Sequence, residues 1–314
     1  MRDVVVIGGG LTGLAAAYEL ERHDVRYTLI EVKPQLGGSI AVGNVAGFTF
    51  DAGPMVHTLS NSATFSQTLT QLVLADATAT VADHEITFAN GTHTLIEAFA
   101  QHITAPVIYR MAVSTLGRFG RSHYSICMEN GMVLDARALI IASPARHSER
   151  MLHTLIPEAA HRLRDYRYQH VAYISVGYNS VDGPFPKTVE AGYPVVSLTE
   201  LCDLPRMPAG TTLLQVGLRY EPEHGLPDDP VGELAALLDW PLNPLADYIG
   251  VWPDGETIMW KDEHHADRLR AVQALLPDSV ALCGSDYIPT GQMPRLDERI
   301  AQGTQAARQV IATL

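Results

Sequence analysis

The chain has 314 residues, a length that allows two hydrophobic cores, so we expect two domains. Hydrophobic residues make up 46% and charged residues 18%, which is typical of globular proteins and excludes a disordered or fibrous chain. The net charge of −13 is spread without acidic runs and argues against nucleic acid or an anionic membrane as a partner. A small-molecule substrate is therefore the expected partner.

Neither a leader peptide nor a membrane segment is expected. A predicted strand begins at Val4, which leaves no room for the charged and apolar regions of a signal peptide. No uninterrupted apolar stretch approaches the roughly 20 residues that a bilayer requires. Cys127, Cys202 and Cys283 lie far apart and form no C-x-x-C pair. These features favour a cytoplasmic protein, and the sequence does not predict its oligomeric state.

A dinucleotide-binding pattern opens the chain. Residues 4–7 are apolar and β-branched and predict a buried parallel strand, and residues 14–20 predict a helix rich in alanine. The loop between them has the spacing G-x-G-x-x-G, and its predicted cofactor contacts are Gly8, Gly10, Leu11, Thr12 and Gly13. In this pattern the first glycine permits a tight turn, the second lets a pyrophosphate approach the backbone, and the third lets the helix pack closely.

An acidic residue follows the second predicted strand. Residues 27–30 form this strand, which ends at Glu31. A carboxylate at this position can accept hydrogen bonds from ribose hydroxyls, and it disfavours the 2′-phosphate of NADP. The strand, glycine loop, helix, strand and acid together predict a dinucleotide site but do not distinguish NAD from FAD.

The following residues resemble the flavin amine oxidase and protoporphyrinogen oxidase family. Residues 31–38, EVKPQLGG, have the family's acid followed by two glycines, and residues 48–54, FTFDAGP, resemble its segment beside the flavin ring. The resemblance implies FAD as the cofactor, with contacts from Lys33, Gly37, Gly38, Gly53 and Pro54. Members often have basic residues where this chain has Gln35 and Ser39, so charge-assisted contacts to the cofactor would be missing there.

The C-terminal residues 280–307 resemble the last flavin-binding segment of the same family. The resemblance implies a turn at Gly284 that faces the cofactor, with either Ser285 or Asp286 as the polar contact. It also implies a helix whose first amide, at Leu296, faces flavin N1 and O2. Reduction makes this edge of the ring negative, and the positive end of a helix stabilises an anion. Gly303 would let this helix approach a neighbouring helix closely.

The middle of the chain gives weaker signals. A capping-box pattern at Thr94 predicts a helix to about residue 103, and Asn130-Gly131 predicts a hairpin turn. The predicted strands nearby are 107–113, 125–129, 132–134 and 138–142. The resemblance implies that the backbone of Val113 contacts the adenine and that Trp260 lines the flavin cavity. Ordinary structural roles for these two residues remain open.

We therefore predict an α/β fold: a Rossmann-like FAD-binding domain with a parallel sheet and a β meander, plus an inserted, smaller α+β substrate domain. The predicted FAD-binding domain is discontinuous, with residues 1–145 and 265–314, and residues 146–264 form the substrate domain. Full-length members carry a large helical region where this chain has only the interval from Pro54 to Asn90. Much of that lid is expected to be missing.

The predicted function is that of a protoporphyrinogen oxidase-like, FAD-dependent oxidoreductase. It would oxidise an apolar or tetrapyrrole-like small molecule by hydride transfer to flavin N5. The alternatives are an amine oxidase, a polyene desaturase or isomerase, and a flavin- or tetrapyrrole-binding protein without turnover. The histidine spacing predicts no metal site. A second glycine pattern for NADPH is not found, and no catalytic acid or base is identified.

Overall fold

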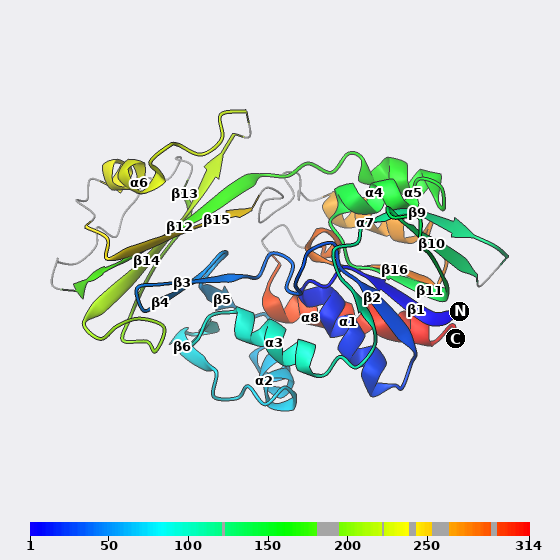
Figure 1. Ribbon diagram of the computed structural model, residues 1–314, viewed down its shortest axis with the longest axis horizontal. Coiled ribbons are helices and arrows are strands. Elements are labelled where there is room, and N and C mark those ends of the chain that lie inside the picture. The colour runs from blue at the N-terminus through cyan, green and yellow to red at the C-terminus, as the bar shows by residue number, and fades with distance from the viewer. Residues whose placement is uncertain (121–122, 181–194, 222, 239–242, 253–263, 290–293) are drawn as a thin grey trace.

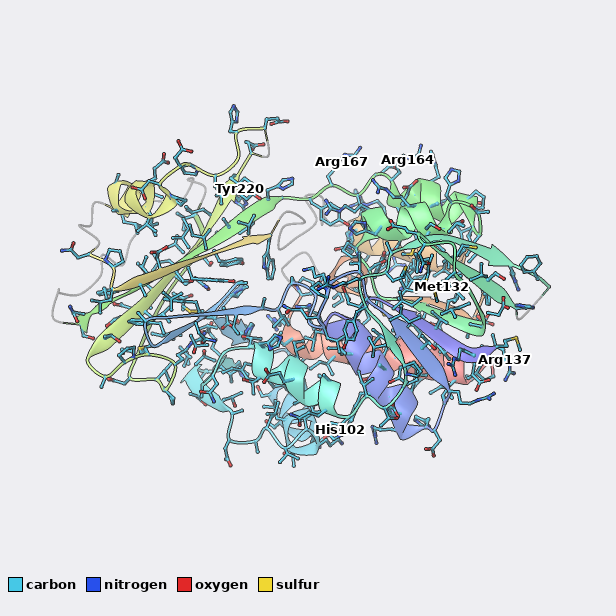
Figure 2. The ribbon with its side chains drawn as sticks, in the orientation of Figure 1. His102, Met132, Arg137, Arg164, Arg167 and Tyr220 are labelled. Atoms are coloured by element: carbon cyan, nitrogen blue, oxygen red, sulfur yellow. The ribbon has the colours of Figure 1, made fainter. Side chains whose placement is uncertain are left out.

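The computed structural model describes residues 1–120, 123–180, 195–221, 223–238, 243–252, 264–289 and 294–314. Figure 1 shows two groups of elements: a large sheet with helices on both faces, which carries both termini, and a smaller sheet with helix α6 at its side. In Figure 2, Met132 marks the group with the large sheet, and Tyr220 marks the group with the smaller sheet.

The large sheet has the order β8-β2-β1-β11-β10-β9, and β16 pairs with the C-terminal half of β11. Strands β8, β2, β1, β11 and β16 are parallel, while β9 and β10 complete an antiparallel meander with β11. The strands are β1 Arg2–Ile7, β2 Tyr27–Ile30, β8 Val107–Ile108, β9 Val113–Arg118, β10 Tyr124–Met128, β11 Val133–Ile141 and β16 Val280–Leu282.

Helices cover both faces of this sheet (Figure 1). One core contains Val4 and Val6 of β1 with α1 Leu11–Arg22, α3 His93–Gln101 and α8 Leu296–Ile311. The other core contains alternate β1 side chains and the helices α4 Ala145–Leu152, α5 Pro157–Leu163 and α7 His265–Gln273. A strand buried on both faces needs apolar residues at every position, which explains the uninterrupted β1 sequence.

The smaller sheet is antiparallel, with the order β13-β14-β12-β15. Helix α6 Pro230–Leu238 packs on one face, and Phe48 and Phe50 pack against the other. These aromatic residues belong to a hairpin of β3 Val42–Val45 and β4 Phe48–Asp51. The four strands are β12 His170–Asn179, β13 Val195–Cys202, β14 Thr211–Tyr220 and β15 Ala246–Trp252.

The interval after Pro54 forms a compact unit. It contains β5 Val56–Thr58, α2 Ser62–Gln71, β6 Thr78–Ala82 and β7 Glu85–Phe88, and its three strands pair in the order β5-β7-β6.

The predicted α/β fold with a parallel sheet and a meander is confirmed, but two local predictions are wrong. The predicted strands 132–134 and 138–142 form one strand, β11 Val133–Ile141, which pairs first with β10 and then with β1 and β16. The expected capping box at Thr94 does not form, because α3 begins at His93 with Thr92 as its N-cap. Helix α5 and all but the first residue of α4 fall within the predicted range 146–264, but both helices pack on the large sheet.

Candidate functional site

Two glycine segments meet at the C-terminal end of β1. Gly10 forms a parallel bridge with Gly37, and the Gly37 amide donates to the Gly9 carbonyl over 2.8 Å. A Cβ atom on Gly38 would lie 3.0 Å from the Cα of Gly10, so the two backbones are in direct contact. Gly37 has a φ of 119°, which favours glycine. The structure thus brings both predicted glycine segments into one cradle that contains no side chains at these positions.

Helices α1 and α8 are held beside this cradle by backbone contact. A Cβ atom on Gly13 would lie 1.9 Å from the Gly8 carbonyl oxygen, and one on Gly303 would lie 2.2 Å from the Thr12 carbonyl oxygen. Arg308 of α8 also donates to buried Glu19 of α1 over 2.7 Å. The predicted close approach at Gly303 is confirmed, and the first and last segments of the chain are fixed side by side.

Glu31 connects the two glycine segments through hydrogen bonds. Its carboxylate is buried and accepts the Gly9 amide over 2.6 Å and the Lys33 amide over 2.7 Å. The Lys33 ammonium in turn donates to the Gly38 carbonyl over 2.7 Å. An ionised carboxylate has about four lone-pair sites, so both Glu31 oxygens can accept a further hydrogen bond from a ribose hydroxyl.

The turn after β16 is also tied to other elements. The Gly284 amide donates to the Gln302 side chain over 2.7 Å. One carboxylate oxygen of Asp286 accepts the Ala145 amide over 2.7 Å and the Tyr168 hydroxyl over 2.5 Å. Asp286 therefore connects the turn after β16 to the start of α4, and Ser285 is the first residue of the same 3-10 turn, Ser285–Tyr287.

A cavity of about 230 Å³ begins at Ser39, the residue after Gly37 and Gly38. Five described parts of the chain line it: the residues after Gly38, the segment from the end of β4 through β5, the N-cap of α3, the end of β15 and the start of α8. Its described lining residues are Ser39, Ile40, Ala41, Asp51, Gly53, Pro54, Val56, His57, Thr58, Thr92, Trp252, Pro294, Arg295, Leu296 and Arg299. The structure therefore brings the predicted residues Gly53, Pro54 and Leu296 to one cavity.

A buried polar network supports one wall of this cavity. Arg206 pairs with Asp51 over 2.9 Å, and their side chains are 0% and 2% exposed. Asp51 also accepts the Thr92 amide over 2.8 Å. Burial raises the pKa of Asp51, and the Arg206 guanidinium and the Thr92 amide oppose this shift. Because each charge in this pair is compensated, the network fixes the end of β4 beside the cavity.

His57 lies between this network and α8. Its Nε2 atom is 2.9 Å from the Thr92 hydroxyl. Burial, followed by the positive charges of Arg299 and Arg206, lowers the pKa of His57 to about 3. The imidazole is therefore neutral near pH 7, where it has one donor and one acceptor nitrogen.

Gln215 of β14 holds the loop that carries Gly53. Its side-chain amide donates to the Gly53 carbonyl and the Ser175 hydroxyl, each over 3.0 Å, and its oxygen accepts the Met55 amide over 3.0 Å. This contact ties a cavity wall to the smaller sheet. The sequence did not predict Gln215, Arg206 or His57 as residues of the site; Arg206 belongs only to a loose Arg-x-Pro resemblance, and the partners of Arg206 and Gln215 lie far along the chain.

The tryptophan of the cavity is Trp252, whose ring would lie 2.3 Å from a Cβ atom on Gly53. The predicted residue Trp260 lies outside the described residues. Val113 begins β9 and packs against the second core, and it does not line the cavity. Within the described ranges, His, Cys, Asp and Glu side chains form no cluster of three that could hold a metal ion. Within the same ranges, no helix has the length and apolarity to cross a bilayer.

Comparisons with curated proteins give short matches. Coproporphyrinogen III oxidase of Bacillus subtilis is 39% identical over 59 residues, which cover 17% of this chain and 13% of that protein. A lycopene-forming phytoene desaturase of Pseudescherichia vulneris is 45% identical over 58 residues, which cover 18% of this chain and 12% of that protein. Each match therefore spans about an eighth of the relative's own length.

Solved structures match over the whole chain. A protein of Exiguobacterium sp. 255-15, provisionally assigned as a protoporphyrinogen oxidase, has a TM-score of 0.80 at 14% identity and covers 100% of this chain and 99% of its own. A putrescine oxidase triple mutant has a TM-score of 0.78 at 13% identity, with coverages of 100% and 99%. At these identities the likeness shows the fold alone.

Two family profiles match adjacent parts of the sequence. The profile of an NAD(P)-binding Rossmann-like domain matches residues 6–72, where the glycine cradle lies. The profile of flavin-containing amine oxidoreductases matches residues 75–238, just over half of the chain. The chain belongs to the flavin-containing amine oxidoreductase family.

Proposed function

We propose that the protein is an FAD-dependent oxidoreductase that oxidises an apolar or tetrapyrrole-like small molecule. The observation that carries this proposal is the continuity between the glycine cradle and the cavity. Residues 37–41 run from one to the other, and the start of α8 closes the far side. An extended dinucleotide needs this arrangement, with backbone amides at its phosphates and a pocket at its ring.

The residues present fit FAD. The cradle leaves backbone amides open to a pyrophosphate, because Gly10 and Gly38 carry no side chains there. We propose that Glu31 binds the ribose and that Gly53, Pro54 and Leu296 contact the ring. Leu296 is the first residue of a 16-residue helix, whose positive end stabilises negative charge on a bound ring. When bound, FAD supplies the electron-accepting chemistry, and the chain binds and orients it.

The remaining parts of the proposal concern domains and contacts. We propose that residues 1–145 and 265–314 bind FAD and that residues 146–264 contribute to the substrate side. Val113 at the adenine and either Ser285 or Asp286 near the pyrophosphate complete the proposed contacts. The similarity of one short segment to a coproporphyrinogen III oxidase and to a phytoene desaturase supports a tetrapyrrole-like or polyene substrate.

Substitution of Gly10 tests the cofactor assignment. Gly10 has a φ of −75°, and a Cβ atom there would meet only the Cα of Gly38 at 3.8 Å, so alanine is compatible with the fold. The added methyl group would occupy the space that a pyrophosphate enters. We expect Gly10→Ala to retain the melting temperature and to weaken FAD binding by about tenfold or more, measured by flavin fluorescence.

The control is Gly117→Ala in β9, where a Cβ atom would lie 4.0 Å from the Ser125 carbonyl oxygen. It should bind FAD like the wild type. If Gly10→Ala binds FAD as tightly as the control, or if the wild-type protein takes up no flavin, the cofactor assignment is wrong.

Anaerobic mixing tests the substrate. Bleaching of the flavin absorbance by a reduced tetrapyrrole supports the proposed function, and bleaching by a polyene or an amine supports those alternatives. A flavin that no such compound reduces, although dithionite does, would indicate a binding protein without turnover.

A further inference from the structure

Arg299 differs from the other arginines that the structure describes near the site. It lies on the first turns of α8 and lines the cavity, and its Nε atom is buried without a hydrogen-bond partner. No hydrogen bond or ion pair joins its side chain to any residue of the described ranges. Arg206, by contrast, is neutralised by Asp51. Arg164 and Arg167 lie at the surface on the opposite side of the large sheet (Figure 2).

The acidic residues beside Arg299 are engaged elsewhere. The Oδ2 atom of Asp297 accepts the backbone amides of Ser60 and Asn61 over 2.8 and 2.7 Å, whereas its Oδ1 atom is buried and has no hydrogen-bond partner in the described part of the chain. Glu298 accepts the Arg295 amide over 2.9 Å and the Ser60 hydroxyl over 2.8 Å. These contacts turn both carboxylates of the first helical turn toward the residues before α2.

The cavity wall therefore carries excess positive charge. Among its described lining residues, Asp51 is the one carboxylate, and it is paired with Arg206. Arg295 and Arg299 add two cations, whereas the lowered pKa of His57 keeps that ring neutral. Burial lowers the pKa of Arg299 to about 10, which still leaves the guanidinium charged near pH 7. A local positive potential in a chain of net charge −13 favours an anion in this cavity.

We infer that Arg299 is the anion-binding residue of the cavity and that its guanidinium holds a planar oxyanion. A partly buried guanidinium whose Nε has no partner destabilises the folded chain, and a bound anion would remove that cost. The planar guanidinium matches a carboxylate or a similar delocalised group through two parallel hydrogen bonds. The oxyanion can come from a carboxylate of the substrate or from the negatively charged edge of the reduced flavin ring; the inference rests on the proposed function for the second source.

The test compares Arg299→Met with Arg162→Met, which removes a surface arginine of α5 whose side chain is 46% exposed. Because the Arg299 side chain has no hydrogen-bond partner among the described residues, its replacement leaves no group unsatisfied and should leave the melting temperature unchanged or raise it. Arg299→Lys keeps the positive charge but loses the planar guanidinium, which can donate two parallel hydrogen bonds. FAD content is measured first, so that loss of flavin from all variants reports on the proposed function and not on Arg299.

Two titrations then distinguish the sources. Sulfite adds to N5 of the oxidised flavin and leaves the electron pair as negative charge on the ring, so its affinity reports stabilisation of that charge. The affinity for benzoate, measured by calorimetric titration of the protein with and without FAD, reports a site for a carboxylate. Loss of one charge-assisted contact should weaken the relevant ligand by roughly 10- to 100-fold in Arg299→Met.

If sulfite binds more weakly to Arg299→Met but binds to Arg299→Lys with the wild-type affinity, the anion is the flavin ring. Weaker benzoate binding assigns it to the substrate. If Arg299→Met alters both affinities no more than Arg162→Met does, the inference is overturned. A strongly lowered melting temperature of Arg299→Met that Arg299→Lys restores, with both affinities unchanged, would also overturn it.

Discussion

Replacement of Arg206 by methionine tests how the cavity wall is held. Arg206 comes from the loop between β13 and β14, and its guanidinium reaches Asp51 over 2.9 Å and the Thr49 carbonyl over 2.8 and 3.0 Å. Both side chains of the ion pair are buried. Methionine fills most of the arginine volume but donates no hydrogen bond. The substitution therefore removes the donors from a buried carboxylate and a backbone carbonyl without opening a large cavity.

The expected loss follows from these contacts. A buried acceptor without its donor costs about 1–3 kcal/mol, and breaking a buried ion pair on one side costs about 3–5 kcal/mol. Protonation of Asp51, whose pKa is already raised by burial, limits the loss to this range. We expect Arg206→Met to lower the free energy of unfolding by about 3–5 kcal/mol in urea denaturation followed by circular dichroism.

Asp51→Asn provides the second side of a double-mutant cycle. Asparagine removes the charge and can still accept the Thr92 amide. The double variant should therefore be more stable than Arg206→Met alone, with a coupling energy of about 1–3 kcal/mol. Arg219→Met, at an exposed position of β14, serves as the control. A loss below about 1 kcal/mol for Arg206→Met, or simple additivity in the cycle, would refute this account of the wall.

Two further substitutions address the helix contact and the neutral histidine. Gly303→Ala would place a Cβ atom 2.2 Å from the Thr12 carbonyl oxygen, so it should destabilise the protein by about 1–3 kcal/mol in thermal denaturation and weaken FAD binding, although alanine favours a helix. An unchanged melting temperature would contradict the backbone contact. Because the folded pKa of His57, about 3, lies below its ordinary 6.5, the unfolded chain binds the extra proton, and stability falls by about 1.4 kcal/mol per unit as pH drops through this window. His57→Gln should remove this part of the acid sensitivity in urea denaturation at pH 7 and pH 5.

The large sheet could be predicted because its signals are local. Val4 and Val6 face one core, and Val5 and Ile7 face the other, so the strand is apolar at every position. The spacing of the glycine loop lies within six residues, and the hairpin turn lies within two, with Gly131 at a φ of 83°. Such patterns need no knowledge of distant parts of the chain.

The cavity walls depend on contacts that no local pattern encodes. Asp51 meets Arg206, and Gly53 meets Gln215, although more than a hundred residues separate the members of each pair. A buried arginine and a buried glutamine carry no periodic signal of their own. The capping box at Thr94 failed for a related reason: Asp51 and His57 engage Thr92, which is the N-cap of α3, so the helix starts two residues earlier than predicted.

The interval after Pro54 also fixes the start of α8. Ser60 and Asn61 at the start of α2 bind the carboxylate of Asp297, and the Ser60 hydroxyl binds Glu298. The interval thus fixes the first turn of α8 and withdraws both acids from the cavity. If these acids faced the cavity, they would neutralise Arg299 and repel an anion. The contacts of Ser60 and Asn61 with the first turn of α8 thus hold both acids outside the described lining of the cavity, which contains Arg295 and Arg299.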